Sequence, residues 1–180
     1  MNEVWKSVRG LVDHLYSQPG IELKPAFIAL DILCLACYHG RSYHARERIL
    51  TYKGNYACEQ HPYFRFARCV ARCESPLEFF NHIYPDPPDP DFTFLLDSLI
   101  DPMRNKAVQH LRKAYYSVSK AWAARWLGVS AVDEKETSKR IMDFVNRYSG
   151  EGGCTEDENG MFRFSRIKTK TPASTSSPAP

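Results

Sequence analysis

Two cysteines in the first quarter of the chain have a spacing that could support chemistry. Cys34 and Cys37 are separated by two residues. Thiols at this spacing can bind zinc or form a redox-active disulfide. Further zinc ligands could come from His39, His44, Cys58 and His61.

The surroundings of these cysteines favour packing over metal binding. Between Ala26 and Tyr38 the only charged residue is Asp31, which predicts a buried helix. Structural zinc sites usually hold their thiolates on loops. We therefore predict no metal site and no cofactor.

The first residues lack the apolar core of a secretory signal, so we interpret the six cysteines as reduced core residues of a cytoplasmic and nuclear protein.

No other motif in the sequence indicates catalysis. It contains no phosphate-binding loop, no nucleophile elbow and no zinc-protease helix motif. The glycine-rich stretch 150–153 follows a predicted helix, whereas glycine loops that bind phosphate precede one. Asp86, Asp89 and Asp91 alternate with prolines, and we interpret them as a solvated loop rather than a cation site. The sequence thus predicts a protein that is not an enzyme.

Composition and charge describe an ordinary globular protein with an uneven charge distribution. Hydrophobic residues make up 43% and charged residues 25%. No apolar stretch reaches the ~18 residues of a membrane helix, and we expect no membrane association. The formal net charge is +3 and residues 163–180 contribute +4, so the rest of the chain sums to 3 − 4 = −1. A near-neutral body is a poor partner for nucleic acid.

Segments of helical periodicity fill the first half of the chain. We predict helices over the ranges 3–17, 25–38, 42–52, 62–73 and 76–83. Pro25, Pro62 and Pro76 stand at the first positions of three of them, where the missing N–H costs nothing. Short helices with tight connections predict an antiparallel helical-repeat solenoid.

The proline-rich run 85–90 is the best internal boundary, since it suits neither helix nor strand. Beyond it, 92–99 forms an apolar stripe, and Asp101 with Pro102 predicts the start of a new helix that extends to about Tyr116. We expect two further helices. One is capped by Ser117 or Ser119 and ended by Gly128, and the other covers about 133–148, capped by Asp133 or Ser130.

A β-hairpin follows these helices. The run 157–160 ends in Asn-Gly, which accepts positive φ, and 161–165 alternates like a half-buried strand. Helices followed by a hairpin are the order of a winged helix. The predicted fold class is therefore mainly α, with a short antiparallel helical-repeat solenoid followed by a winged helix. We divide the chain into a helical-repeat segment (1–91), a winged-helix module (92–168) and a disordered tail (169–180).

Aromatic residues make up 13% of the chain, which is more than a small module buries, so some should contact a partner. Our candidates for partner contact are Trp122, Trp126, Met161, Phe162, Arg163 and Phe164. Alternation along the strand puts Phe162 and Phe164 on one face, and we expect both to pack near Trp126 and Tyr148.

An alternative function is nucleic-acid binding. The helix over 133–148 would then be the recognition helix, but its four basic and four acidic side chains cancel, and its first turn is acidic. Specific DNA binding is therefore not favoured. Weak RNA contact through the basic tail stays open.

Three segments of the second half resemble a known family. They are Phe92–Ala107, Lys113–Ser119 and Ala124–Val129, and they include Arg104, Ala114-Tyr115 and Leu127-Gly128. The pattern is similar to that of PCI-domain scaffold proteins, in particular the family that groups the smallest COP9 signalosome subunit, a 26S proteasome lid non-ATPase subunit and subunit k of translation initiation factor 3. The resemblance is good over about 92–128, weaker over the hairpin and faint over 26–84.

The resemblance implies a non-catalytic scaffold subunit whose winged helix pairs strand edges with other PCI-type subunits. The run Leu127-Gly128-Val129 slightly favours the signalosome, in which the subunit would support the removal of a ubiquitin-like modifier from cullins by a different, metal-bearing subunit. Phe92–Tyr115 is closest to the proteasome lid subunit, and 155–162 is similar to the initiation-factor subunit. These two complexes are the alternatives.

Overall fold

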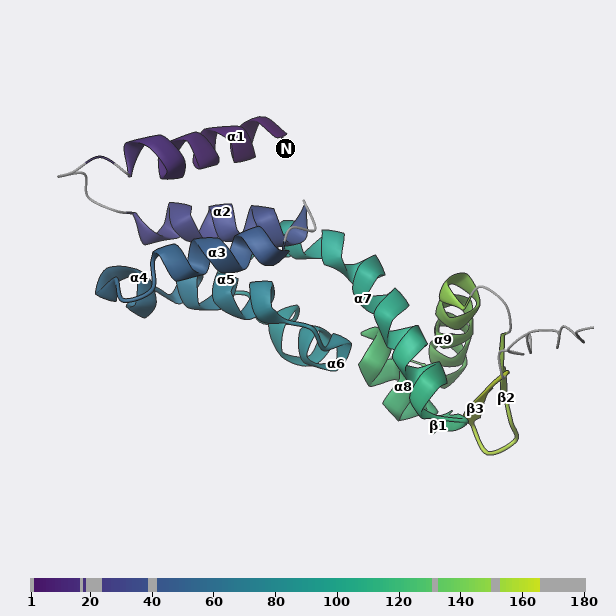
Figure 1. Cartoon of the computed structure of the whole chain (residues 1–180). Helices are drawn as coiled ribbons and strands as arrows, with labels where there is room; N and C mark the ends of the chain where they lie inside the picture. Colours follow the sequence, from purple (N-terminus) through teal and green to yellow (C-terminus); the bar gives the residue numbers. More distant parts are fainter. Residues whose placement is uncertain are drawn as a thin grey trace, which may run out of the picture.

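The computed structural model describes residues 2–16, 18, 24–38, 42–130, 133–149 and 153–165. The described part of the chain is mainly helical, with one small sheet near its C-terminal end. The helices of the first half stack beside one another, and the long helix α7 leads away from them to a second group of elements (Figure 1). Among the described helices, none is long and apolar enough to span a membrane. The predicted disordered tail (169–180) lies outside the described residues.

Short helices form the first half, as the periodicity predicts. They are α1 (Asn2–Gly10) with the π-helical segment η1 (Leu11–Leu15), α2 (Pro25–Cys37), α3 (Ser42–Thr51), α4 (Tyr56–Gln60), α5 (Pro62–Arg72), α6 (Pro76–Glu78) and the π-helical segment η2 (Phe79–Ile83). Pro25, Pro62 and Pro76 each begin a helix. The short helix α4 is not among the predicted ones.

Helix α2 lies at the centre of this half. It packs against α1, α3, α5 and α7, which explains why it is apolar nearly all round. Its one charged residue, Asp31, is fully buried and pairs with Nε of Arg48 on α3 at 2.8 Å. Arg48 also pairs with Asp13 of η1, and Asp13 with Arg9 of α1. A chain of ion pairs therefore connects α1, η1, α2 and α3, from the partly exposed Arg9 to the buried Asp31.

Helix α7 (Phe92–Ala114) is continuous, so the predicted helix start at Asp101-Pro102 is wrong. Pro102 lies inside α7, where it cannot donate to the carbonyl of Ser98. Packing on both sides of Pro102 outweighs this loss. Leu96 is buried among the N-terminal helices and Leu111 among the C-terminal elements, so the helix is held at each end.

The elements after α7 are a strand, two helices and a two-stranded hairpin. They are β1 (Ser117–Ser119), α8 (Lys120–Leu127), α9 (Glu134–Tyr148), β2 (Cys154–Glu156) and β3 (Met161–Phe164). The cap residues Ser119 and Asp133 accept from backbone N–H groups, and Gly160 in the hairpin turn has a φ of 70°, as predicted. The strand β1 is not predicted from the sequence. The sheet is antiparallel in the order β1-β3-β2.

The boundary between two hydrophobic cores lies within α7. The N-terminal core includes Phe92 and Leu96, with Met103 packed against it, and the C-terminal core begins at Ala107. The predicted boundary at residue 91 precedes this point. Side chains of α7 therefore belong to both cores, and the helix joins the two halves of the molecule.

Candidate docking surface

The small sheet has β3 at its centre, so its two outer edges belong to β1 and β2. The N–H of Phe164 donates to the carbonyl oxygen of Tyr116 at 3.1 Å, which makes these two residues a hydrogen-bonded pair of the ladder. Such pairs alternate along an antiparallel ladder, so Val118 directs its backbone groups toward Phe162, and Ser117 directs its own away from β3. The backbone N–H and C=O of Ser117 therefore face the outer edge of β1.

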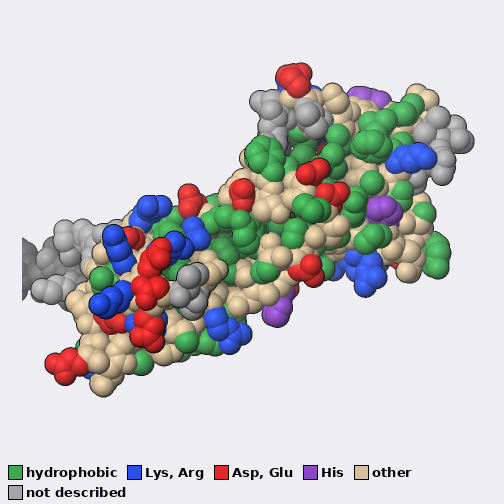
Figure 2. Space-filling view, turned by 180° about the vertical axis from the view of Figure 1, so that it is seen from behind, with side chains coloured by type: hydrophobic (Ala, Val, Ile, Leu, Met, Phe, Trp, Pro, Cys, Tyr) green, Lys and Arg blue, Asp and Glu red, His purple; other side chains and the backbone are tan. Residues whose placement is uncertain are grey.

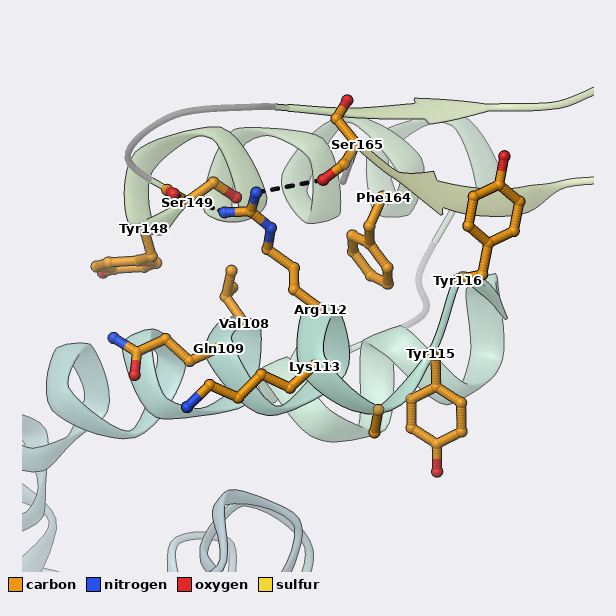
Figure 3. A pocket seen from close by; sticks show the side chains of 11 residues that line it. Val108, Gln109, Arg112, Lys113, Tyr115, Tyr116, Tyr148, Ser149, Phe164 and Ser165 are labelled. Atoms are coloured by element: carbon orange, nitrogen blue, oxygen red, sulfur yellow. Dashed lines mark hydrogen bonds between the residues drawn. The ribbon is translucent and has the colours of Figure 1, made fainter. Parts of the chain in front are cut away.

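A pocket of about 620 Å³ lies between the end of α7, Tyr116 just before β1, and the ends of α9 and β3 (Figure 3). Arg112 crosses it. Its guanidinium donates from Nη1 to the carbonyl oxygen of Ser149 at 2.6 Å and from Nη2 to that of Ser165 at 3.4 Å. Arg112 thus ties the end of α9 to the end of the hairpin.

The other lining residues combine aromatic rings with positive charge. Tyr115 is 40% exposed and Tyr116 is 61% exposed, and Lys113 stands beside them at the end of α7. Tyrosines supply large rigid contact area with a polar tip, and they are enriched in protein interfaces. The outer edge of β1 follows directly after Lys113, Tyr115 and Tyr116 in the chain, and such an edge is suited to docking a peptide strand or a neighbouring sheet.

Arg104 fixes the C-terminal elements to the rest of the molecule. Its Nε donates to the carbonyl oxygen of Leu127 at 3.1 Å, at the end of α8. Its guanidinium carbon lies 4.1 Å from the centre of the Phe144 ring of α9 and 5.8 Å from that of Phe80 in η2. A planar cation can stack on aromatic rings while it bonds at its edge. One side chain of α7 therefore contacts α8, α9 and η2.

Gly128 makes a close contact at the same junction. Its φ of 63° ends α8 in the left-handed conformation, which favours glycine. A Cβ at this position would overlap the ring of Phe80 at Cδ1. The close packing of η2 on the end of α8 thus explains why a glycine follows Leu127 in the Leu-Gly pair of the family resemblance.

The six predicted partner-contact residues lie in different environments. Phe162 is 0% exposed and Phe164 is 4% exposed, so both rings belong to the C-terminal core and are not available to a partner. This corrects their assignment as contact residues. Trp126 and Tyr148 pack against the same core, as expected, and Arg163 and Ser165 on the other face are exposed.

The remaining candidates keep some exposed surface. Met161 is half-buried, and Arg163 pairs with Asp157 of the hairpin turn, with Nη2 3.0 Å from Oδ2. The backbone N–H of Met161 and the Arg163 side chain hold the pKa of Asp157 below its usual value. Trp122 and Trp126 are half-buried on α8 with ring centres 6.4 Å apart, and Arg125 stacks over Trp122 at 5.6 Å. The tryptophans lie on α8, whereas Met161 and Arg163 lie on the hairpin.

The cysteine pair lies in the N-terminal core. Cys34 and Cys37 are buried on α2, and burial raises the pKa of their thiols to about 11 and about 12. Both are therefore protonated at neutral pH, and a thiol in this state is a poor nucleophile and metal ligand. Within the described ranges, no three metal-ligating side chains come together. His39 lies outside those ranges.

Acidic and basic residues are separated along the middle of the chain. Residues 73–103 contain no lysine or arginine and seven acids: Glu74, Glu78, Asp86, Asp89, Asp91, Asp97 and Asp101. Residues 104–132 contain no acid and six cations: Arg104, Lys106, Arg112, Lys113, Lys120 and Arg125. The change of sign falls in the middle of α7. Figure 2 shows acidic side chains among hydrophobic ones over the centre of one face of the molecule.

Sequence comparison identifies the family to which this architecture belongs. The profile of the CSN8/PSMD8/EIF3K family matches residues 68–171, which is more than half of the chain. The chain belongs to this family. The match begins in α5 and includes the Arg104 junction, the pocket and the whole sheet, so it extends in both directions from the 92–128 range of the motif resemblance. No curated protein and no solved structure matches the chain.

Proposed function

We propose that the chain is a non-catalytic scaffold subunit of a PCI-type multiprotein complex, held there by its C-terminal elements. The family match over 68–171 carries this proposal, because the family comprises small PCI-type subunits of large complexes. The chain is not itself an enzyme in this proposal, and it works in the cytoplasm and the nucleus.

The element order supports a winged helix at the C-terminal end. A helix, a strand, two helices and a hairpin follow one another from the second half of α7 to β3, and β1 pairs with β3 rather than with its neighbours in sequence. The short helices from α1 to η2 precede it in the chain, and α1, α3 and α5 pack around α2. In this arrangement the outer edge of β1 is the docking edge, with Tyr115 and Tyr116 beside it.

Among the three complexes that the family spans, we favour the COP9 signalosome. The run Leu127-Gly128-Val129 supports this choice. In that complex the chain would support cullin modifier removal by another subunit. The proteasome lid and translation initiation factor 3 are the alternatives.

Affinity purification of the tagged full chain from its own cells tests the proposal and separates the complexes. Recovery of signalosome subunits in near-stoichiometric amounts is the expected result. Recovery of proteasome ATPases with lid subunits, or of ribosomes with initiation factors, would reassign the complex. Recovery of the chain alone at physiological salt would contradict every version.

A nucleic-acid-binding winged helix is the alternative of another class. The cationic run 104–132 favours it, whereas the acidic first turn of α9 and the Glu136–Arg140 ion pair on that helix oppose it. Binding through phosphates weakens steeply with salt. Filter binding of a short RNA that persists at physiological salt and has a steep salt slope would support this alternative.

A further inference from the structure

We propose that the outer surface of α3 and α5 is the docking site of an acidic amphipathic helix from a partner protein. Three arginines of α5 carry the proposal: Arg65, Arg68 and Arg72. The surface lies in the N-terminal half, on other elements than the β1 edge. The inference therefore goes beyond the proposed function and does not depend on it.

The three arginines lie on one side of α5. At about 100° of rotation per residue, positions 65, 68 and 72 fall within about 60° of one another around the helix. Arg65 and Arg72 are exposed, and Arg68 is half-buried. Within the described part of the chain, none of the three guanidinium groups makes an ion pair or a hydrogen bond. Their positive charges are therefore open to a partner.

The spacing of these arginines costs helix stability. Like charges three or four residues apart repel each other on a helix surface, and Arg65 with Arg68 and Arg68 with Arg72 are two such pairs. The helix contains no acid that could offset them. Charges that repel one another in the separate chain become favourable when a partner brings the opposite charge.

The side of α3 that borders α5 extends this surface. Nε of Arg46 donates to the carbonyl oxygen of Ala71 on α5 at 3.4 Å, and the two helices lie side by side (Figure 1). Leu50 is four residues after Arg46, so it shares that side of α3, and it is 60% exposed. Lys53 follows in the turn after α3, where it is exposed and makes no ion pair with a described residue. The surface thus combines an open apolar side chain with cations.

The acids nearest to this surface already have interactions. Glu74 pairs with Nη2 of Arg46 at 2.7 Å. Glu59 of α4 accepts from a backbone N–H of the turn after α3 at 3.1 Å. Glu78 of α6 turns toward Cys73, with its Oε2 4.0 Å from Sγ. None of them pairs with the arginines of α5.

The remaining acids of this half lie on other sides of the two helices. Glu47, the one acid of α3, lines a pocket together with residues of α1 and η1. In the loop before α7, Asp89 accepts from the hydroxyl of Tyr63 at 2.8 Å, and the Tyr63 ring lies 4.9 Å from that of Phe92. Position 63 is almost opposite the arginines around α5. The surface therefore keeps an excess of positive charge.

Charge and shape together specify the partner. The helices α3 and α5 offer no strand edge, so the mode of binding that fits them is the packing of another helix. An apolar stripe of that helix would cover Leu50, and glutamates or aspartates beside the stripe would meet the arginines. Guanidinium groups bind carboxylates through two parallel hydrogen bonds. A nucleic acid fits less well, because Glu59 and Glu74 near the two ends of α5 would repel a longer chain of phosphates.

Binding of designed peptides to the full-length chain tests the inference. The probe is a fluorescently labelled amphipathic peptide of about 18 residues, with leucines on one helical face and glutamates beside it. One control peptide has glutamine at every glutamate position, and another keeps the composition but scrambles the leucine positions. Fluorescence anisotropy should show that the glutamate peptide binds at least about tenfold more tightly than either control peptide.

A variant without the arginine charges locates the binding. Arg65→Gln/Arg68→Gln/Arg72→Gln should weaken binding of the glutamate peptide by about tenfold, because three charge pairs are lost. The same variant should melt at or slightly above the temperature of the wild type, since the repulsion between the arginines is also removed. The loss of binding is thereby separated from a loss of folding.

A matched variant controls for total charge. Lys113→Gln/Lys135→Gln/Lys139→Gln removes the same charge from exposed positions of the C-terminal half, and it should change the affinity by less than about twofold. Leu50→Ala tests the apolar part of the surface. It should weaken binding by about fivefold, because the leucine is covered by the peptide in the complex.

Cys69 provides a reporter within the proposed site. All six cysteines lie in described parts of the chain, and Cys69 is the exposed one. It lies four residues after Arg65 and three before Arg72, on the same side of α5. Saturating glutamate peptide should slow the alkylation of Cys69 by a maleimide severalfold. An unchanged rate in the presence of bound peptide would place the peptide elsewhere and overturn the inference.

Four further outcomes would overturn it. Equal binding of the glutamate and scrambled peptides would reduce the effect to charge alone. Equal losses in the two triple variants would make total charge, rather than α5, the cause. A single-stranded RNA of about 12 nucleotides that binds more tightly than the peptide, and is lost in the arginine variant, would assign the surface to nucleic acid. A dimer in sedimentation experiments that the arginine variant dissociates would assign it to a second copy of this chain. None of these outcomes bears on the recovery of complex subunits in affinity purification, so the two proposals fail separately.

Discussion

Arg104 donates a hydrogen bond from Nε to the carbonyl oxygen of Leu127 at 3.1 Å, and its guanidinium stacks on Phe144 at 4.1 Å. This side chain holds the ends of α8 and α9 against α7. Arg104→Ala should therefore lower the free energy of unfolding by about 2–3 kcal/mol, as the sum of a charged hydrogen bond and a partly buried cation–π contact. Arg104→Lys should recover little of this loss, because an ammonium group cannot both stack and bond at its edge.

Urea unfolding of the two Arg104 variants measures this effect. Arg125→Ala is the control, since Arg125 stacks on Trp122 from an exposed position and should cost less than about 1 kcal/mol. Equal losses for Arg104→Ala and Arg125→Ala would mean that Arg104 does not hold the junction.

Gly128 is expected to tolerate no side chain. Gly128→Ala adds a Cβ that would overlap the Phe80 ring, on a backbone with a φ of 63°. Gly54 also has a positive φ, of 87°, but nothing lies within 4 Å of its added Cβ. Gly54→Ala should cost about 1 kcal/mol for the left-handed conformation alone, and Gly128→Ala should cost clearly more. Thermal unfolding of the two variants gives the difference, and equal melting temperatures would show that Phe80 does not press on Gly128.

Asp31 makes the stability of the N-terminal half depend on Arg48. Burial raises the pKa of Asp31, and the ion pair with Arg48 opposes that rise. Arg48→Met leaves a buried carboxylate without its partner, so it should cost about 3–5 kcal/mol at pH 7. Arg48→Met/Asp31→Leu should recover much of that loss, because no unpaired charge remains buried.

The loss in Arg48→Met should also depend on pH in a defined direction. Without Arg48, the folded-state pKa of Asp31 lies further above its unfolded value, so folding favours the protonated form. The penalty is therefore absent below the unfolded pKa, near 4, and grows as pH rises through the folded pKa. Urea unfolding from pH 4 to pH 8 should show a deficit that narrows on acidification. A deficit independent of pH would mean that the lost packing of Arg48, rather than the charge of Asp31, sets the cost.

The two faces of β3 should respond differently to truncation. Phe164→Ala removes a buried ring and should cost about 3–5 kcal/mol. Arg163→Ala removes a half-exposed ion pair with Asp157 and should cost at most about 1 kcal/mol. The melting temperature of each variant checks this. A Phe164→Ala protein that melts like the wild type would place the ring outside the core.

Local patterns in the sequence predicted most helices, because caps and proline positions act over a few residues. Ser119, Asp133 and Pro62 each mark a helix start that the structure contains. The same rule failed at Asp101-Pro102, because a start signal and a tolerated interior proline look alike in sequence. Only contacts between residues far apart in the chain decide between them, such as the hydroxyl of Ser98 bonding to the carbonyl oxygen of Cys37 at 2.9 Å.

The candidate docking surface was predicted in part. Alternation in 161–165 correctly predicted the buried face of β3. Because Phe162 and Phe164 lie on that buried face, a partner cannot reach them, and their assignment as contact residues was wrong. The edge at Ser117 was missed, because a three-residue strand is too short for alternation to distinguish it from a helix cap. The pocket at Arg112 and Tyr116 could not be predicted from the sequence, because it forms between these residues and the distant end of α9. The change from an acidic to a basic stretch near Arg104 can be read from the sequence. That this change falls within the single helix α7 cannot, because the sequence predicted a new helix at Asp101.

Docking through the β1 edge is tested most directly by comparing Ser117→Pro with Ser117→Ala. Proline removes the N–H that faces outward from β1 but leaves the pairing of Val118 with Phe162 in place, whereas alanine keeps that N–H. Each tagged full-length variant is expressed in the native cells, and the bound subunits are quantified by mass spectrometry alongside the melting temperature of the purified chain. Ser117→Pro should lose most of the co-purifying subunits while it melts within a few degrees of Ser117→Ala, which should assemble like the wild type. Full assembly of Ser117→Pro would contradict docking through this edge.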